Sequence, residues 1–260
     1  VPVMEELGAG TQALHEIDLD TRTALLADPT WREMFKKQWS NPLSPKAWHR
    51  DLDEPKIIDC PDPALVRRTF ASIAAERGIE PLDCFLDLQV EFGNDLRWYT
   101  VVGNDRLREL EYVVTHPTVL IGFSDAGAHL RNMAYYDFPL HLLRLVVNAE
   151  AEGRSLMARE QAVHRVTGEI ADYLGIDAGR LEVGARADIV VVDPATLDDR
   201  LDAMTEEEMV GMPGLDRLVR RHDACVPAVL VNGRVTWRDG AFAEGFGDER
   251  GYGRVLRAAP

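Results

Sequence analysis

The fold is decided by the stretch Val119-Leu120-Ile121-Gly122-Phe123-Ser124-Asp125-Ala126-Gly127-Ala128-His129, in which a short apolar run ends on a carboxylate. The run 119–123 is too short for a helix and rich in β-branched residues, so it predicts a strand buried on both faces. Asp125 would then stand at the carboxyl end of that strand, where the active sites of α/β enzymes lie. An aspartate before a helix is also a common N-cap, because its oxygen accepts free backbone N–H groups. The spacing alone leaves both interpretations of Asp125 open.

Composition limits the partners that the chain can have. Of its 260 residues, 46% are hydrophobic, which is enough for a sizeable core in one large or two medium domains. The formal net charge of -15 argues against nucleic acid or an anionic membrane surface as partner, since both reward clustered lysine and arginine. The sequence holds no run of about eighteen apolar residues, so no membrane-spanning helix is expected.

The cysteines indicate the cell compartment of the protein, and the N-terminus indicates how the chain relates to a longer one. Its 3 cysteines, Cys60, Cys84 and Cys225, are far apart and odd in number, which fits a reducing compartment better than a disulfide framework. We therefore expect the protein to be cytoplasmic. The chain begins at Val1 without a signal-peptide pattern or an initiator methionine, and we expect it to be a piece of a longer protein.

Strands and helices alternate in the middle of the sequence. The pattern predicts strands at 98–102 and 119–123, which are expected to be parallel neighbours, each followed by a helix, 106–114 and 138–150. Asn104 then lies at the same sheet edge as Asp125, although capping the following helix is its ordinary role. Outside this region the pattern predicts a strand at 56–60 and helices at 63–77, 81–91 and 158–174.

The character of the sequence changes after Gly175. A strand at 188–193 is stopped by Pro194, and two further strands, 228–231 and 235–237, flank Asn232-Gly233, the strongest short hairpin signal. The acidic run 206–208 is expected to be a solvated helical turn. We therefore predict two domains, an α/β portion over 1–175 and a small β-rich subdomain with a tail over 176–260.

Several motifs, taken in order, resemble the amidohydrolase superfamily, and within it the N-acyl-D-amino-acid deacylases. They are His116-Pro117, the stretch 121–129 quoted above, Gln161-Ala162-Val163-His164-Arg165-Val166-Thr167-Gly168, the segment 181–194 with Gly184-Ala185-Arg186-Ala187-Asp188 and Asp193-Pro194, and Val229-Leu230-Val231-Asn232-Gly233. Each motif is weak alone, and the resemblance covers about residues 55–240. It implies the C-terminal part of a metal-dependent (β/α)8 barrel of the TIM type, plus a small β-sandwich subdomain.

The resemblance also implies a chemistry. The expected activity is hydrolysis of C–N amide bonds, with N-acyl-D-amino acids as the small-molecule substrates and a divalent metal, expected to be Zn2+, as cofactor. The metal would lower the pKa of a bound water, while Asp125 would serve as a metal ligand and accept the water's proton. His129 would orient Asp125 or hold the oxyanion, Arg131 would meet a substrate carboxylate, and Asn104 would face the same mouth. A loop histidine bonded to backbone and a surface arginine are the ordinary alternatives.

The sequence departs from the family in its other metal ligands. It contains no His-x-His pair, and His15, His49 and Cys60 lie in contexts unlike those of the family's ligands. We therefore expect a fragment that needs the missing N-terminal half of the barrel, is inactive alone, and is poorly soluble or associates, for instance as a homo-oligomer.

The alternatives to this assignment are three other classes of protein. One is a cyclic-amide hydrolase such as a dihydroorotase or hydantoinase, and another is a non-catalytic structural half of a barrel. A nucleotide-binding α/β domain would need a glycine-rich loop after a strand, and the sequence has none.

Overall fold

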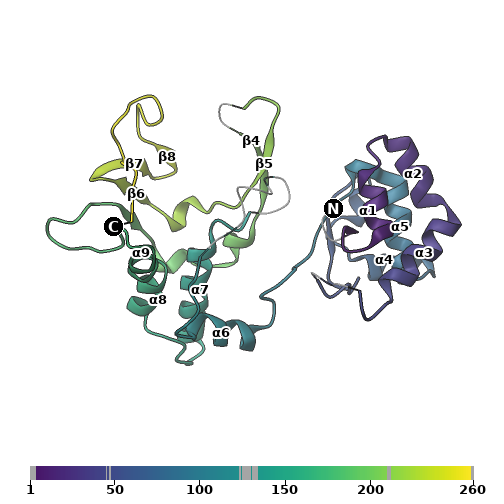
Figure 1. The fold of residues 1–260 in the computed structure, drawn as a ribbon, viewed down its shortest axis with the longest axis horizontal. Coiled ribbons are helices and arrows are strands. Elements are labelled where there is room, and N and C mark those ends of the chain that lie inside the picture. Colours follow the sequence, from purple (N-terminus) through teal and green to yellow (C-terminus); the bar gives the residue numbers. More distant parts are fainter. Residues whose placement is uncertain are drawn as a thin grey trace. The chain divides into compact units, whose positions relative to one another are not determined.

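The computed structural model describes residues 4–44, 46, 48–122, 124, 130, 134–209 and 212–258. The chain forms two compact units, Val1–Leu110 and Glu111–Pro260 (Figure 1). The predicted domain division at residue 175 stays a prediction. It follows the change from helices to strands, which the structure places between α9 (Gly168–Leu174) and β3 (Ile189–Val191). Within the described ranges, every helix is too short or too polar to cross a membrane.

The first unit is mainly helical. Local sequence signals begin its helices, because the side chains of Asp18, Asp28 and Thr69 each accept the backbone N–H of the third residue that follows. Prolines occupy the first position of two of them. The helix predicted over 81–91 is confirmed, whereas the helix predicted over 63–77 is α-helical only over 70–77. The helices are α1 (Gly8–His15), α2 (Leu19–Ala27), α3 (Pro29–Trp39), α4 (Phe70–Arg77) and α5 (Pro81–Phe92), with one-turn 3-10 helices at Pro63–Leu65 and Gly93–Asp95.

An aromatic core holds the first unit together. Phe85 is fully buried, and its ring centroid lies 5.0 Å from that of Phe70 and 5.5 Å from that of Trp98. Trp48 extends this cluster, at 5.8 Å from Trp39 and 6.0 Å from Trp98. The irregular segment before residue 56 is therefore packed against the helices through its tryptophan.

The two strands of the first unit correct the predicted topology. β1 (Lys56–Asp59) pairs antiparallel with β2 (Arg97–Tyr99), whereas a parallel pairing of 98–102 with 119–123 was expected. The residues 119–122 form no strand. A strand needs a neighbouring ladder, and the carbonyl of Val119 instead accepts a hydrogen bond from Arg165 Nη2 at 2.5 Å. The parallel pair is thus wrong for the described residues.

The helices of the second unit agree with the prediction except at one break. α6 (Leu107–Thr115), which spans the division between the units, and α7 (Phe138–Ala151) were expected. The helix expected over 158–174 is two helices, α8 (Arg159–Arg165) and α9. Between them the backbone of Gly179 lies against Thr167, so closely that a Cβ on Gly179 would stand 2.7 Å from the Thr167 carbonyl carbon. On α8, Ala162 and Arg165 are buried, whereas Val163 is exposed.

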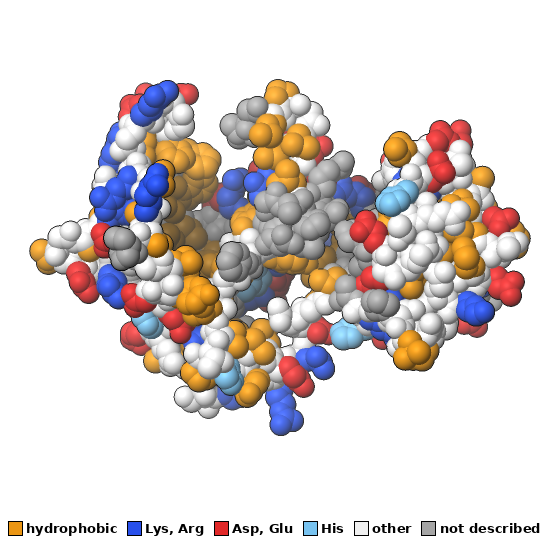
Figure 2. Space-filling view, in the orientation of Figure 1, with side chains coloured by type: hydrophobic (Ala, Val, Ile, Leu, Met, Phe, Trp, Pro, Cys, Tyr) orange, Lys and Arg blue, Asp and Glu red, His pale blue; other side chains and the backbone are white. Residues whose placement is uncertain are grey.

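The strands of the second unit are antiparallel. The sheet has the order β3-β6-β7-β8, where β6 is Ala228–Val231, β7 is Arg234–Arg238 and β8 is Ala241–Phe242. The predicted hairpin is confirmed, since Asn232 and Gly233 both have positive φ, 52° and 80°, as a two-residue turn requires. Orange apolar side chains gather beside β7 and β8 in Figure 2, and Val190 and Phe242 are among the exposed residues of this sheet.

The acidic run 206–208 is a strand rather than the expected helical turn. β4 (Thr205–Glu208) pairs with β5 (Asp216–Val219), and the register places Glu207 opposite Arg217. Opposite charges across an antiparallel pair favour the strand, and a local pattern of acidic residues does not reveal that pairing. The chain as a whole is a mixture of helices and sheets, consistent with the α/β class.

Candidate functional site

Three of the four predicted site residues, Asp125, His129 and Arg131, lie outside the described residues, so their roles stay predictions. Asn104 is described and exposed, in the loop between β2 and α6. Its φ of 62° is in the left-handed region, which asparagine tolerates better than most residues. The next residue, Asp105, forms a side-chain hydrogen bond with His49.

The start of the motif stretch is tied to α8. Arg165 is buried, with 5% of its side chain exposed, and its Nη2 donates to the carbonyls of Val119 at 2.5 Å and His116 at 3.3 Å. Glu169, one turn further on, lies 3.4 Å from Arg165 Nη1. A buried guanidinium with these acceptors fixes the backbone that leads into Asp125. In the sequence, Arg165 is one residue of the motif 161–168, and no local pattern marks it as buried.

The other side of the motif stretch is tied to β5. The backbone N–H of Leu218 donates to the carbonyl of Leu130 at 2.7 Å, and that of Arg220 donates to the Tyr136 hydroxyl at 2.5 Å. The guanidinium of Arg217 lies over the Tyr136 ring, 5.3 Å from its centroid. Residues distant in sequence thus hold both Leu130 and Tyr136.

An ion network lies beside this contact. Asp137, with 6% of its side chain exposed, lies 2.9 Å from His141 Nε2 and 3.7 Å from Arg220 Nε. Arg220 Nη2 also pairs with Asp202 at 3.0 Å, and Arg144 pairs with Asp202 at 2.9 Å. Burial would raise the pKa of Asp202, but the hydrogen bond from Arg144 and the neighbouring positive charges lower it overall. Asp137 before Phe138-Pro139 is a recognisable helix start, whereas nothing in the sequence around Arg220 signals its role.

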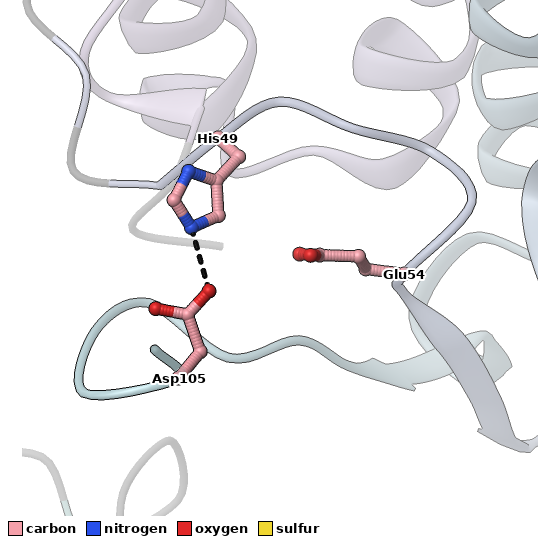
Figure 3. A group of neighbouring side chains, drawn as sticks. All are labelled: His49, Glu54 and Asp105. Carbon is pink, nitrogen blue, oxygen red and sulfur yellow. Dashed lines mark hydrogen bonds and ion pairs between the residues drawn. The ribbon is translucent and has the colours of Figure 1, made fainter. Parts of the chain in front are cut away.

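A group that can hold a metal ion lies in the first unit. His49 Nε2 is 2.8 Å from Asp105 Oδ2, and the carboxylate of Glu54 points toward both (Figure 3). The three donor atoms lie within 4.8 Å of one another. All three residues are exposed, and the hydrogen bond from His49 lowers the pKa of Asp105. Over the described ranges, this is the one such group of histidine, cysteine and acidic side chains. His49 lies in a sequence context unlike that of the family's ligands, and its partner Asp105 is distant in the sequence.

The curated proteins that are similar to this chain are named as uncharacterized proteins. No family model matches the chain. Uncharacterized proteins of Mycobacterium tuberculosis and Mycobacterium bovis are 46% identical to it over 264 residues, which is 99% of this chain and 43% of theirs. The chain therefore spans less than half the length of the curated relatives it matches.

Solved structures that are similar to this chain include a D-aminoacylase, described as defining a subset of amidohydrolases, and an N-acyl-D-glutamate deacylase. One is D-aminoacylase, 24% identical, with a TM-score of 0.44 over 80% of this chain and 39% of that one. Another is the N-acyl-D-glutamate deacylase of Bordetella bronchiseptica, in complex with zinc and a phosphonate inhibitor. It is 27% identical, with a TM-score of 0.43 over 80% of this chain and 38% of that one.

Proposed function

We propose that this chain is part of a metal-dependent amidohydrolase that removes the acyl group from N-acyl-D-amino acids. The observation that carries the proposal is the stretch Gly122-Phe123-Ser124-Asp125-Ala126-Gly127-Ala128-His129, followed in order by the motifs at 161–168, 181–194 and 229–233. The contacts of Arg165 with Val119, and of β5 with Leu130, support it. They hold Val119, which precedes Asp125 in the sequence, and Leu130, which follows it.

Asp125 carries the chemistry in this proposal. A divalent metal, Zn2+ by resemblance, lowers the pKa of a water molecule when it is bound. Asp125 offers a hard oxygen ligand to that ion, accepts a proton from the attacking water, and returns it to the leaving nitrogen. His129 orients Asp125 or donates to the oxyanion, and Arg131 binds a substrate carboxylate. Asn104 faces the mouth of the same site.

The remaining ligands of that metal belong to another part of the protein in this proposal. The one group of three donors found in the described ranges lies in the first unit, and Asp125 lies outside those ranges. We assign the other ligands to the N-terminal half of a (β/α)8 barrel, of which this chain supplies the C-terminal part. Residues 119–123 then become a strand once they have neighbours on both sides, and 176–260 form a sandwich with the other chain end. The dispersed cysteines support a cytoplasmic location for the enzyme in this proposal.

The test compares Asp125→Asn with its parent in a polypeptide of the relatives' full length that includes these 260 residues. Asparagine still accepts a hydrogen bond and still caps a helix, so fold and stability should change little. Hydrolysis of an N-acyl-D-amino acid should lose about a hundredfold or more in kcat, since general-base catalysis typically supplies 10²–10⁴-fold. KM should change far less, because the carboxylate acts mainly in the transition state.

Metal content and thermal melts are measured on both proteins, so that a lost ion is not mistaken for a lost base. Activity of the variant close to that of the parent, at equal metal occupancy, removes Asp125 from the mechanism. Hydrolysis of a cyclic amide instead of the acyl-D-amino acid would assign a dihydroorotase-like or hydantoinase-like activity.

A further inference from the structure

The fold of the first unit brings His49, Glu54 and Asp105 together through its strand pair. Lys56 of β1 is registered with Tyr99 of β2. Because the pair is antiparallel, the chain enters β1 beside the place where it leaves β2. The segment 49–54, just before β1, and the segment 100–105, just after β2, therefore lie at the same end of the ladder. The convergence is a consequence of the topology.

The backbone that carries His49 is anchored on both sides. Trp48 is buried in the aromatic core, and Arg50 is buried with an ion pair to Glu6 at 2.8 Å. With both neighbours directed inward, His49 is directed outward, and 46% of its side chain is exposed. Pro55, next to Glu54, is fully buried as well. Anchors of this kind hold ligand atoms in place before an ion arrives, which lowers the entropic cost of binding.

The group carries negative charge and is exposed, so a cation can reach it. Asp105 and Glu54 are both acidic and exposed, so the group offers two carboxylates to a cation. Among the described residues, no lysine or arginine forms a salt bridge with Asp105 or Glu54. Two carboxylates so close together repel each other, and a divalent ion between them removes that repulsion.

The donor set fits a first-row transition metal. Imidazole nitrogen and carboxylate oxygen bind Zn2+ and its neighbours at about 2.0–2.2 Å, so two ligands of a tetrahedral ion are about 3.4 Å apart. The three donor atoms already lie within 4.8 Å of one another, so small side-chain rotations suffice. We propose that His49, Glu54 and Asp105 bind a divalent transition-metal ion, with water completing its coordination. The proposal does not depend on the amide hydrolysis, because Asp125 is not one of these ligands.

Calorimetric titration of the chain with Zn2+ near neutral pH, in physiological salt and excess Mg2+, tests the site. We expect a saturable binding event that His49→Ala, Glu54→Gln and Asp105→Asn each weaken by at least about tenfold. Titration with Co2+ should give a d–d absorption band that His49→Ala removes. Binding should weaken as the pH falls, since protons compete for the imidazole.

His15→Ala is the matched control, because His15 is an exposed histidine of the same unit at the end of α1. It should bind Zn2+ as the parent does, and Asp125→Asn should also keep this event, which separates the site from the proposed active site. Zn2+ should raise the Tm of the parent and of His15→Ala, and raise it less in Glu54→Gln, an exposed substitution that keeps the fold testable. The proposal is overturned if no saturable event appears, or if the three site variants and His15→Ala bind alike.

Discussion

Replacing Arg220 with methionine should destabilise the second unit strongly, because it uncovers a buried charge. Arg220 has 8% of its side chain exposed and lies between the carboxylates of Asp137 and Asp202. Its Nε also donates to the Leu201 carbonyl at 3.3 Å. Methionine keeps most of the apolar stem but leaves the Asp137 carboxylate buried, with His141 Nε2 at 2.9 Å as its remaining side-chain hydrogen-bond partner among the described residues.

The magnitude follows from these contacts. Breaking a buried ion pair by removing one partner costs about 3–5 kcal/mol, because the other charge stays desolvated. The lower end applies here, since His141 still faces Asp137 and Asp202 is half-exposed. The lost hydrogen bond to Leu201 adds about 1 kcal/mol. We therefore expect the free energy of unfolding to fall by about 3–4 kcal/mol.

The assay is urea unfolding of the chain, followed by circular dichroism at several protein concentrations so that association is detected. Arg221→Met is the matched control, because Arg221 is adjacent in sequence but half-exposed, and its loss should cost at most about 1 kcal/mol. The double variant Asp137→Asn with Arg220→Met should be more stable than the sum of the single changes, since asparagine removes the uncompensated charge. A loss for Arg220→Met no larger than for Arg221→Met, or strict additivity in the double variant, would refute this reasoning.

Two further predictions concern the core of the first unit and acid stability. Phe85→Ala should lower the free energy of unfolding by about 3–5 kcal/mol, because Phe85 is fully buried against Phe70 and Trp98. Urea unfolding measures this loss. A loss below about 1.5 kcal/mol would show that the core collapses around the cavity. The pKa of Asp202 is lowered from 3.8 in the folded chain, so the ionised side chain stabilises the fold. This stabilisation is complete above pH 3.8 and is lost as the pH falls through the pKa of the folded chain. Asp202→Asn should therefore lower Tm by about 2 °C near neutral pH and leave it unchanged at the acid end of a pH series, whereas a gap of the same size at both ends contradicts the assignment.

The sequence by itself determined the elements whose causes are local. The helix beginning at Pro29 follows from Asp28 as N-cap, and α4 ends at Gly78 because that residue takes a φ of 68°. Asn232-Gly233 specified the hairpin between β6 and β7, since the two positive φ values of the turn suit those residues. Each signal acts between residues a few positions apart, which is why a pattern in the sequence reveals it.

Only the tertiary structure decided which distant segments meet. β2 pairs with β1 rather than with 119–123, and Arg165, which lies in a helical motif, is buried against the Val119 carbonyl. His49 and Asp105 meet although long stretches of sequence separate them. Pairing, ion networks and ligand groups depend on free energies summed over contacts between segments, and those contacts exist only after the chain has packed. The role of Asp125 is a prediction from its sequence motif, whereas the group at His49 became visible only in three dimensions.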